Sequence, residues 1–322
     1  MERKIICIGT ATLDVFFIFN SLNFLKKFAL IKEKNNVPEI FIDIGGGALN
    51  STFNLKNLNA NVEGVVKLGN DFIGRIIEKR IEEKKIPVNI LKTKGNSTLS
   101  VIFLNKNSGE KYIFTYRGEE IFNKKDIPQY KNSAYLISTG TTPITIWNDI
   151  ISTMKKNNNF IGILPSSYFL KNNTSKEILK KCDFIVLNEE EAKLILRKNK
   201  NLLDFFKELN KLFENVLIKI VTFGKRGAFL IFKNKVIFVG TLKKLKIVDT
   251  TGAGDCFAST AFGFIIENLD NLNEEVLVNI LKLASINTAY NLREIGAQTG
   301  LLSRKKLLKL KNISIKYKVY EI

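Results

Sequence analysis

Two aspartates enclose a turn of small residues in the stretch DTTGAGDCF, which covers residues 249–257. An apolar run, LKIVD at 245–249, precedes the turn, and apolar residues with helical spacing follow it in CFASTAFGFII. We therefore predict a strand-to-helix turn whose unpaired backbone N–H groups suit a phosphate or a developing oxyanion. Asp255 would take a proton from a hydroxyl that attacks the bound phosphoryl group. The predicted anion hole is formed by the backbone of Gly252, Ala253 and Gly254.

A structural role for the same residues is the alternative. Asp255 would then only complement the helix dipole, and the glycines would only make a tight turn. The chain has no histidine, so any proton transfer falls to a carboxylate, lysine, cysteine or tyrosine side chain.

The composition is that of a globular protein of 322 residues, 45% hydrophobic and 25% charged. The net charge is +19, but the lysines are scattered along the whole chain without a basic arm, so we predict no nucleic-acid partner. No window of eighteen or more uncharged apolar residues appears, and we predict no signal peptide and no membrane partner. Three widely spaced cysteines indicate a reducing, cytoplasmic setting.

The elements that must position the turn follow two patterns. From about residue 134, short β-branched runs such as AYLIS and FIGIL alternate with amphipathic stretches such as ITIWNDIISTMKK. This alternation is typical of a mostly parallel sheet, which places ligands at the carboxyl ends of its strands. The first 120 residues instead hold strand-like segments and a hairpin signal at NSGE. We predict one α/β domain over 1–322, a three-layer body with a β-rich lid formed by insertions at about 11–44 and 96–120.

Four ordered motifs resemble the ribokinase (PfkB) family of sugar and nucleoside kinases. DTTGAGDCF resembles the C-terminal signature of the family, and GGGALNSTFNLKNLNANVEGVVKLGNDFIG resembles the N-terminal one. Between them, NEEEAKLIL and VTFGKRGA resemble an Asn-x-x-Glu and a Thr-x-Gly-x-x-Gly element. The resemblance runs from GTATLD to IGAQTGLL and implies a ribokinase-like α/β/α fold with ATP as phosphoryl donor.

The resemblance also implies the nucleotide and metal residues. Asn188 and Glu191, three apart at a helix start, would organise Mg²⁺ and phosphate largely through water. A simple capping box, with Asn188 as N-cap and Glu191 reaching back, would look the same in sequence. The residues implied to contact ATP are Asn188, Glu191, Thr222, Gly224, Gly227, Ser285 and Asn287.

For the acceptor, Asp14 matches a family carboxylate that accepts hydrogen bonds from two substrate hydroxyls. Gly47 stands where some branches of the family have a lysine, and Leu164 stands where the family often has a polar residue. These two differences leave the identity of the acceptor sugar undetermined. Residues 45–47 would alternatively form only a hinge for the lid, and Arg117 would either touch substrate or sit at a strand end. The acceptor residues implied by the resemblance are Asp14, Gly46, Gly47, Asn50 and Arg117.

Asp249 and Thr251 would form an oxygen-rich nook beside the anion hole. In relatives a potassium ion occupies the matching nook, with further oxygens from the stretch at 291–300, so the resemblance implies a K⁺ site here. Alternatively, Asp249 only caps the backbone of its own turn. Lid edges also invite pairing with a second copy of the chain, so a homodimer through the lid is expected.

These observations predict an ATP- and Mg²⁺-dependent kinase that moves the γ-phosphoryl group to a hydroxyl of a ribose- or fructose-like sugar. The alternatives are an adenosine-like nucleoside kinase and a ligand-binding protein of the same fold that has lost turnover. A dinucleotide-dependent dehydrogenase is disfavoured, because GTATLD follows the first strand where a Gly-x-Gly-x-x-Gly turn would be needed.

Overall fold

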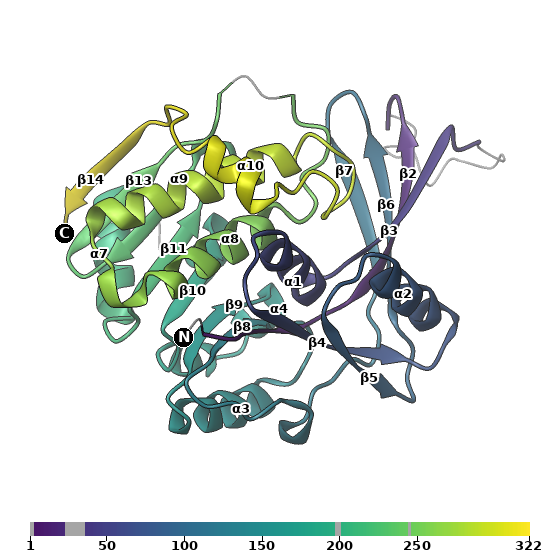
Figure 1. The fold of residues 1–322 in the computed structure, drawn as a ribbon, viewed down its shortest axis with the longest axis horizontal. Coiled ribbons are helices and arrows are strands. Elements are labelled where there is room, and N and C mark those ends of the chain that lie inside the picture. The colour runs from purple at the N-terminus through teal and green to yellow at the C-terminus, as the bar shows by residue number, and fades with distance from the viewer. Residues whose placement is uncertain (1–2, 23–35, 197–200, 244–245) are drawn as a thin grey trace.

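The computed structural model describes residues 3–22, 36–196, 201–243 and 246–322. Its large sheet has the strand order β14-β13-β12-β11-β10-β9-β8-β1-β4-β5 (Figure 1). Strands from β11 through β5 run parallel, whereas β12, β13 and β14 are antiparallel. The strands are β1 (Ile5–Gly9), β4 (Val62–Gly69), β5 (Val88–Thr93), β8 (Ala134–Ser138), β9 (Phe160–Leu164), β10 (Phe184–Asn188), β11 (Ile218–Thr222), β12 (Ala228–Phe232), β13 (Lys235–Val239) and β14 (Tyr317–Glu321).

Helices cover both faces of this sheet and confirm the predicted α/β layering. In β1, Ile5 and Cys7 join one core while Ile6 and Ile8 join the other, because successive side chains of a strand point to opposite faces. The first core includes residues of α1 (Gly47–Asn57), α8 (Ala253–Glu267) and α9 (Glu274–Asn291). The second includes residues of α3 (Ile144–Lys156), α5 (Ser175–Leu179), α6 (Glu189–Leu196) and α7 (Leu202–Leu212). The remaining helices are α2 (Phe72–Glu83), α4 (Ser167–Leu170) and α10 (Arg304–Lys309).

A second, small sheet lies beside the body, with the strand order β3-β2-β6-β7 (Figure 1). Its strands are β2 (Thr12–Phe19), β3 (Glu39–Gly45), β6 (Thr98–Asn105) and β7 (Lys111–Tyr116). They lie in the segments 11–44 and 96–120, except that β3 ends one residue beyond the first segment. Residues 23–35 of the first segment lie outside the described residues. The predicted turn at NSGE joins β6 to β7 as an antiparallel hairpin, and the Gly109 N–H donates to the Asn105 carbonyl at 2.8 Å.

The strand predicted at 245–249 is wrong. Residues 246–249 form no strand in the structure. The Val248 and Asp249 N–H groups both donate to the carbonyl of Leu292, at 2.8 and 3.3 Å. The end of α9 therefore takes the backbone donors that a neighbouring strand would need.

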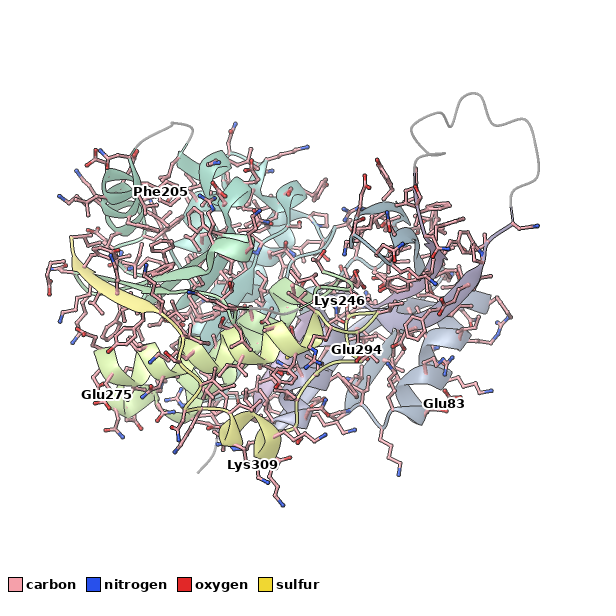
Figure 2. All side chains as sticks on the ribbon, turned by 90° about the horizontal axis from the view of Figure 1, so that it is seen from above. Glu83, Phe205, Lys246, Glu275, Glu294 and Lys309 are labelled. Atoms are coloured by element: carbon pink, nitrogen blue, oxygen red, sulfur yellow. The ribbon has the colours of Figure 1, made fainter. Side chains whose placement is uncertain are left out.

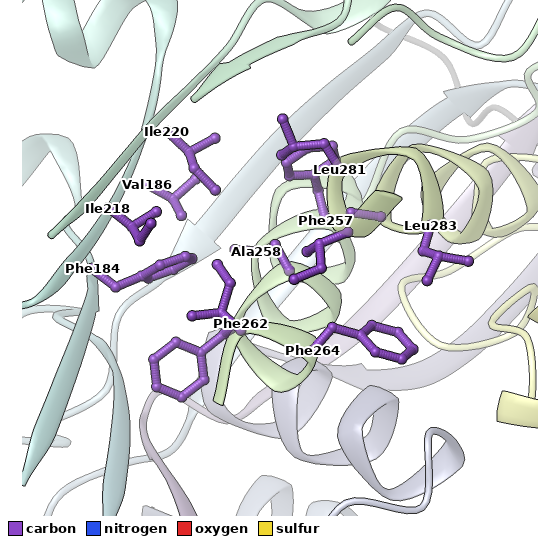
Figure 3. Close-up of a cluster of buried hydrophobic side chains, with 14 of the residues drawn as sticks. Phe184, Val186, Ile218, Ile220, Phe257, Ala258, Phe262, Phe264, Leu281 and Leu283 are labelled. Carbon is purple, nitrogen blue, oxygen red and sulfur yellow. The ribbon is translucent and has the colours of Figure 1, made fainter. Parts of the chain in front are cut away.

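Helix α8 is anchored by a buried cluster beneath it (Figure 3). Phe262 packs against Phe184 of β10, with ring centroids 5.2 Å apart, and against Phe160 of β9 at 5.9 Å. Aromatic pairs of this kind contribute about 0.5–1.5 kcal/mol each beyond their buried area. These contacts fix the middle of α8 against β9 and β10.

The outer surface carries dispersed charge. Figure 2 shows Glu83, Glu275 and Lys309 projecting from separate parts of the molecule. Cys7, Cys182 and Cys256 are free and buried. Among the described residues, none of the helices is both long enough and apolar enough to cross a membrane.

Candidate active site

The carboxyl ends of the parallel strands meet at a small cavity of about 210 Å³. A parallel sheet gathers its ligand-binding loops at this edge, so residues far apart in sequence come together here. The polar residues among those lining the cavity are Ser138, Ser166, Asn188, Glu191, Thr222 and Asp255.

Asp255 lies in the first turn of α8, as predicted, and its carboxylate faces this cavity. Gly252 is the N-cap with φ of 72°, a left-handed conformation that favours glycine. The first N–H groups of a helix have no partner within the helix itself. Here the Ala253 N–H donates to the Thr250 carbonyl at 3.4 Å, and Gly254, the next residue of the first turn, lines the cavity. Burial raises the pKa of the Asp255 carboxyl group, and a hydrogen bond from the Asn50 side chain lowers it in part.

A chain of hydrogen-bonded side chains, which runs through buried Asn50 and Gln298 to the half-buried Lys84, holds Asp255. The Asn50 Nδ2 donates to Asp255 Oδ2 at 2.8 Å, and Asn50 Oδ1 accepts from Gln298 Nε2 at 3.1 Å. Gln298 Oε1 in turn accepts from Lys84 Nζ at 3.0 Å, and the same Nζ pairs with Asp43 of β3 at 2.6 Å. Asn50 is predicted to contact the acceptor, and the structure places its amide against Asp255, the predicted base. Gln298 and Lys84 were missed, although Gln298 belongs to the motif IGAQTG.

Gly47 brings the backbone of α1 close to the cavity. A Cβ atom at Gly47 would lie 2.2 Å from Ser138 Oγ and 3.5 Å from Asp255 Oδ1. A lysine at this position would therefore require Ser138 to move. Gly46, with φ of 94°, is the N-cap of α1.

A larger cavity of about 640 Å³ adjoins the first, because Thr222 and Gly254 line both. It opens between the turn at 224–227, residues 241–243 and 247, and the first turns of α8 beside α9. Four of the residues predicted for the nucleotide line it: Thr222, Gly224, Gly227 and Ser285.

Asn287 does not join them. It is fully buried, its Nδ2 donates to Asn54 Oδ1 and to Thr260 Oγ1 at 2.9 Å, and its Oδ1 accepts from the Leu302 N–H at 3.0 Å. Residues two apart on a helix point in different directions, so Ser285 and Asn287 cannot both face the cavity. Thr288, three residues after Ser285, lines the larger cavity instead. The helical spacing of three residues from Ser285 could have identified Thr288 from the sequence.

Asn188 and Glu191 form the capping box that the sequence left as an alternative. The Asn188 N–H donates to Glu191 Oε2 at 2.8 Å, and the Glu191 N–H donates to Asn188 Oδ1 at 2.9 Å. Both residues also line the small cavity, so capping does not remove them from the site. Burial raises the pKa of the Glu191 carboxyl group.

Asp14 lies on β2 and is buried. Its Oδ1 accepts from Thr12 Oγ1 at 2.8 Å. Burial raises the pKa of Asp14 to about 6, and the nearby carboxylates of Asp43 and Asp249 add to the rise. Arg117 is exposed and lines neither cavity.

The predicted potassium nook holds a lysine side chain. The Nζ of Lys111 lies 3.1 Å from Asp249 Oδ1 and 2.7 Å from Thr251 Oγ1. An ion bound by these two oxygens would occupy the position of the ammonium group. The residues present therefore do not fit a potassium ion while Lys111 stays in place.

Comparisons with known proteins identify several kinases that this chain resembles in sequence and in fold. The chain is 25% identical to a ribokinase from Dictyostelium discoideum, over 93% of this chain and 98% of that protein. It is 26% identical to a nucleoside kinase from Methanocaldococcus jannaschii, over 83% and 85%. The structure of ribokinase from Giardia lamblia has a TM-score of 0.80 at 17% identity, covering 96% of this chain and 98% of that one.

A family model described as pfkB family carbohydrate kinase matches residues 2–304. The predicted ribokinase-like fold and the predicted kinase activity are confirmed by these matches. This chain belongs to the pfkB family of carbohydrate kinases.

Proposed function

We propose that this kinase transfers the γ-phosphoryl group of ATP to a hydroxyl of a ribose- or fructose-like sugar. The observation that carries the proposal is that Asp255, at the start of α8, lines the small cavity, and that the larger cavity adjoins it through Thr222 and Gly254. ATP would occupy the larger cavity, and its γ-phosphate would reach the smaller one near Gly254. The acceptor would approach from the side of the small sheet, where Asp14 lies.

In this reaction the acceptor oxygen attacks the γ-phosphorus as its proton passes to Asp255. The new P–O bond forms while the bond from the γ-phosphorus to the bridging oxygen breaks, and ADP leaves with that electron pair. The backbone N–H groups at 252–254 stabilise the charge on the equatorial oxygens. Phosphoryl transfer depends mainly on such positioning and charge stabilisation.

We propose that Glu191 and Asn188 support Mg²⁺ through bound water. Glu191 uses Oε2 in the capping box, which leaves Oε1 for a water of the hydrated ion at the small cavity. Mg²⁺ keeps several waters and tolerates such indirect contacts. When bound, the ion would neutralise charge on the phosphates.

Glu191→Gln is expected to raise the Mg²⁺ concentration needed for half-maximal activity by about 10–100-fold, the range for outer partners of a metal. Glutamine at this position keeps the capping box, so the change removes the charge without the cap. The matched control is Glu190→Gln, because Glu190 is exposed on the same helix. A Mg²⁺ titration in which both variants behave like wild type would show that Glu191 only caps the helix and has no role in Mg²⁺ binding.

The sugar and nucleoside alternatives are separated by a screen that measures ADP release with pentoses, hexoses, phosphosugars and nucleosides. We expect the highest kcat/KM with a free pentose or hexose. A preference for nucleosides would favour the runner-up, which the similarity to the Methanocaldococcus jannaschii protein supports. If no member of the panel releases ADP while ATP still binds, the ligand-binding alternative is favoured.

We further propose that the small sheet acts as a lid and as a dimer face. Its strands β3 and β7 expose apolar side chains, including Ile42 and Phe114, the latter 59% exposed. Unpaired apolar strands invite association with a second copy. Sedimentation equilibrium should give a dimer that Phe114→Lys shifts toward monomer, and a wild-type monomer at micromolar concentration would contradict the proposal.

A further inference from the structure

Lys111 links the small sheet to the turn that precedes α8. It is the first residue of β7, and its side chain is only 16% exposed. The ammonium group lies 3.1 Å from the Asp249 carboxylate and 2.7 Å from the Thr251 hydroxyl. The hairpin comes close to the same segment at Gly109, where a Cβ would lie 3.5 Å from the Val248 carbonyl oxygen.

Asp249 is the buried centre of this contact, with 1% of the residue exposed. Its Oδ1 accepts from the Thr251 N–H at 2.9 Å and from the Thr251 hydroxyl at 2.8 Å. Its Oδ2 accepts from the Gly296 N–H at 3.0 Å. The carboxylate therefore fixes the backbone directly before Gly252 and joins it to the segment after α9.

A carboxylate at this depth needs a positive partner, because burying an unpaired charge is strongly unfavourable. Lys111 supplies that charge, and it does so from a strand of the small sheet, 138 positions away in the chain. Its contact with Thr251 also orients the hydroxyl that bonds Asp249. One ammonium group thus contacts both Asp249 and Thr251, the residues that lead directly into the N–H groups at 252–254.

We propose that Lys111 is a built-in monovalent cation for the anion-hole turn, so that this enzyme needs no added potassium. Lys111 is a positioning residue: it acts on the phosphoryl group through Asp249 and Thr251. The proposal goes beyond the phosphoryl transfer proposed above and rests on it for its kinetic test. It replaces the expectation of a potassium ion at Asp249 and Thr251.

The test replaces Lys111 by methionine, which removes the charge and keeps a long unbranched side chain. Assayed without alkali ions, in a tetramethylammonium buffer, Lys111→Met should lose about 10–100-fold in kcat, the range for groups that act behind a bound ion. Potassium or ammonium at constant ionic strength should restore most of this loss, whereas the rate of wild type should not change. The matched control is Lys106→Met, because Lys106 is exposed on the same hairpin and should resemble wild type.

A second readout does not depend on turnover. Potassium should raise the Tm of Lys111→Met and leave the Tm of wild type unchanged, because only the variant has a vacant cation position. Lys111→Gln, which is shorter and neutral, should show the same response if the methionine variant does not fold. In the variant, Rb⁺ should give an anomalous scattering peak beside Asp249.

Wild-type activity that requires potassium would overturn the proposal. So would a Lys111→Met enzyme with unchanged rate, or a loss of rate and Tm that no small cation restores, which would make Lys111 only a tether for the hairpin. If wild type phosphorylates no acceptor, the proposed function fails, yet the Tm and scattering measurements still decide whether a cation replaces the ammonium group.

Discussion

Asp255→Asn is expected to lower kcat by about 10²–10⁴-fold, the range typical of losing a general base. Asparagine has nearly the same shape, so the Asn50 contact and the start of α8 should persist. ATP affinity should change little, because the base acts in the transition state and contributes little to ground-state binding. Single-turnover kinetics with the acceptor found in the screen would measure the loss in the chemical step.

The pH profile gives an independent check on Asp255. The base must be ionised to accept a proton, and burial raises the pKa of this carboxyl group above the ordinary value of about 3.9. The rate should therefore begin to fall, as pH decreases, at a higher pH than an exposed aspartate would give. Asp270→Asn, an exposed acid beyond the far end of α8, should keep both rate and profile. Turnover of Asp255→Asn near the wild-type rate would exclude the assignment.

The sequence predicted the body of the fold because its signals are local. Residues 144–156 and 189–196 have helical periodicity, and the structure has α3 and α6 at those bounds. The parallel strands lie in short apolar runs that alternate with such helices. The run at 245–249 has the same composition, but the N–H groups of Val248 and Asp249 bond to Leu292, which lies more than forty positions later. Local composition carries no information about that contact.

The site residues that belong to a local sequence motif were predicted. The residues that come together only through the fold were missed. Asp255 was predicted from the small-residue turn at a helix start. Gln298 and Lys84 meet across 214 positions, and Lys111 reaches Asp249 from the small sheet. Lys84, Lys111 and Lys106 cannot be told apart in the sequence. Only the packing shows that Lys84 and Lys111 bond to residues of the site, whereas Lys106 is exposed.

Asp14 gives the second large expected effect. If its carboxylate holds two acceptor hydroxyls, Asp14→Ala should weaken acceptor binding by about 2–5 kcal/mol, the cost of removing one side of a buried, charged hydrogen-bonded pair. ATP binding should be unchanged, because Asp14 lines neither cavity assigned to the nucleotide. Glu39→Gln, an exposed acid on the neighbouring strand β3, is the matched control. Calorimetry with each ligand separates the two affinities.

The direction of the pH dependence follows from the pKa of Asp14, which burial raises to about 6. Between about 3.9 and that value the folded protein holds a proton that the unfolded chain has lost, so this group reduces stability as pH rises through the window. Acceptor binding needs the ionised form and should weaken as pH falls below about 6. Asp14→Asn should abolish that pH dependence and be no less stable than wild type at pH 7, because it removes a buried charge. Acceptor affinity in Asp14→Asn that equals wild type at pH 7, or still falls below pH 6, would show that another group binds the hydroxyls.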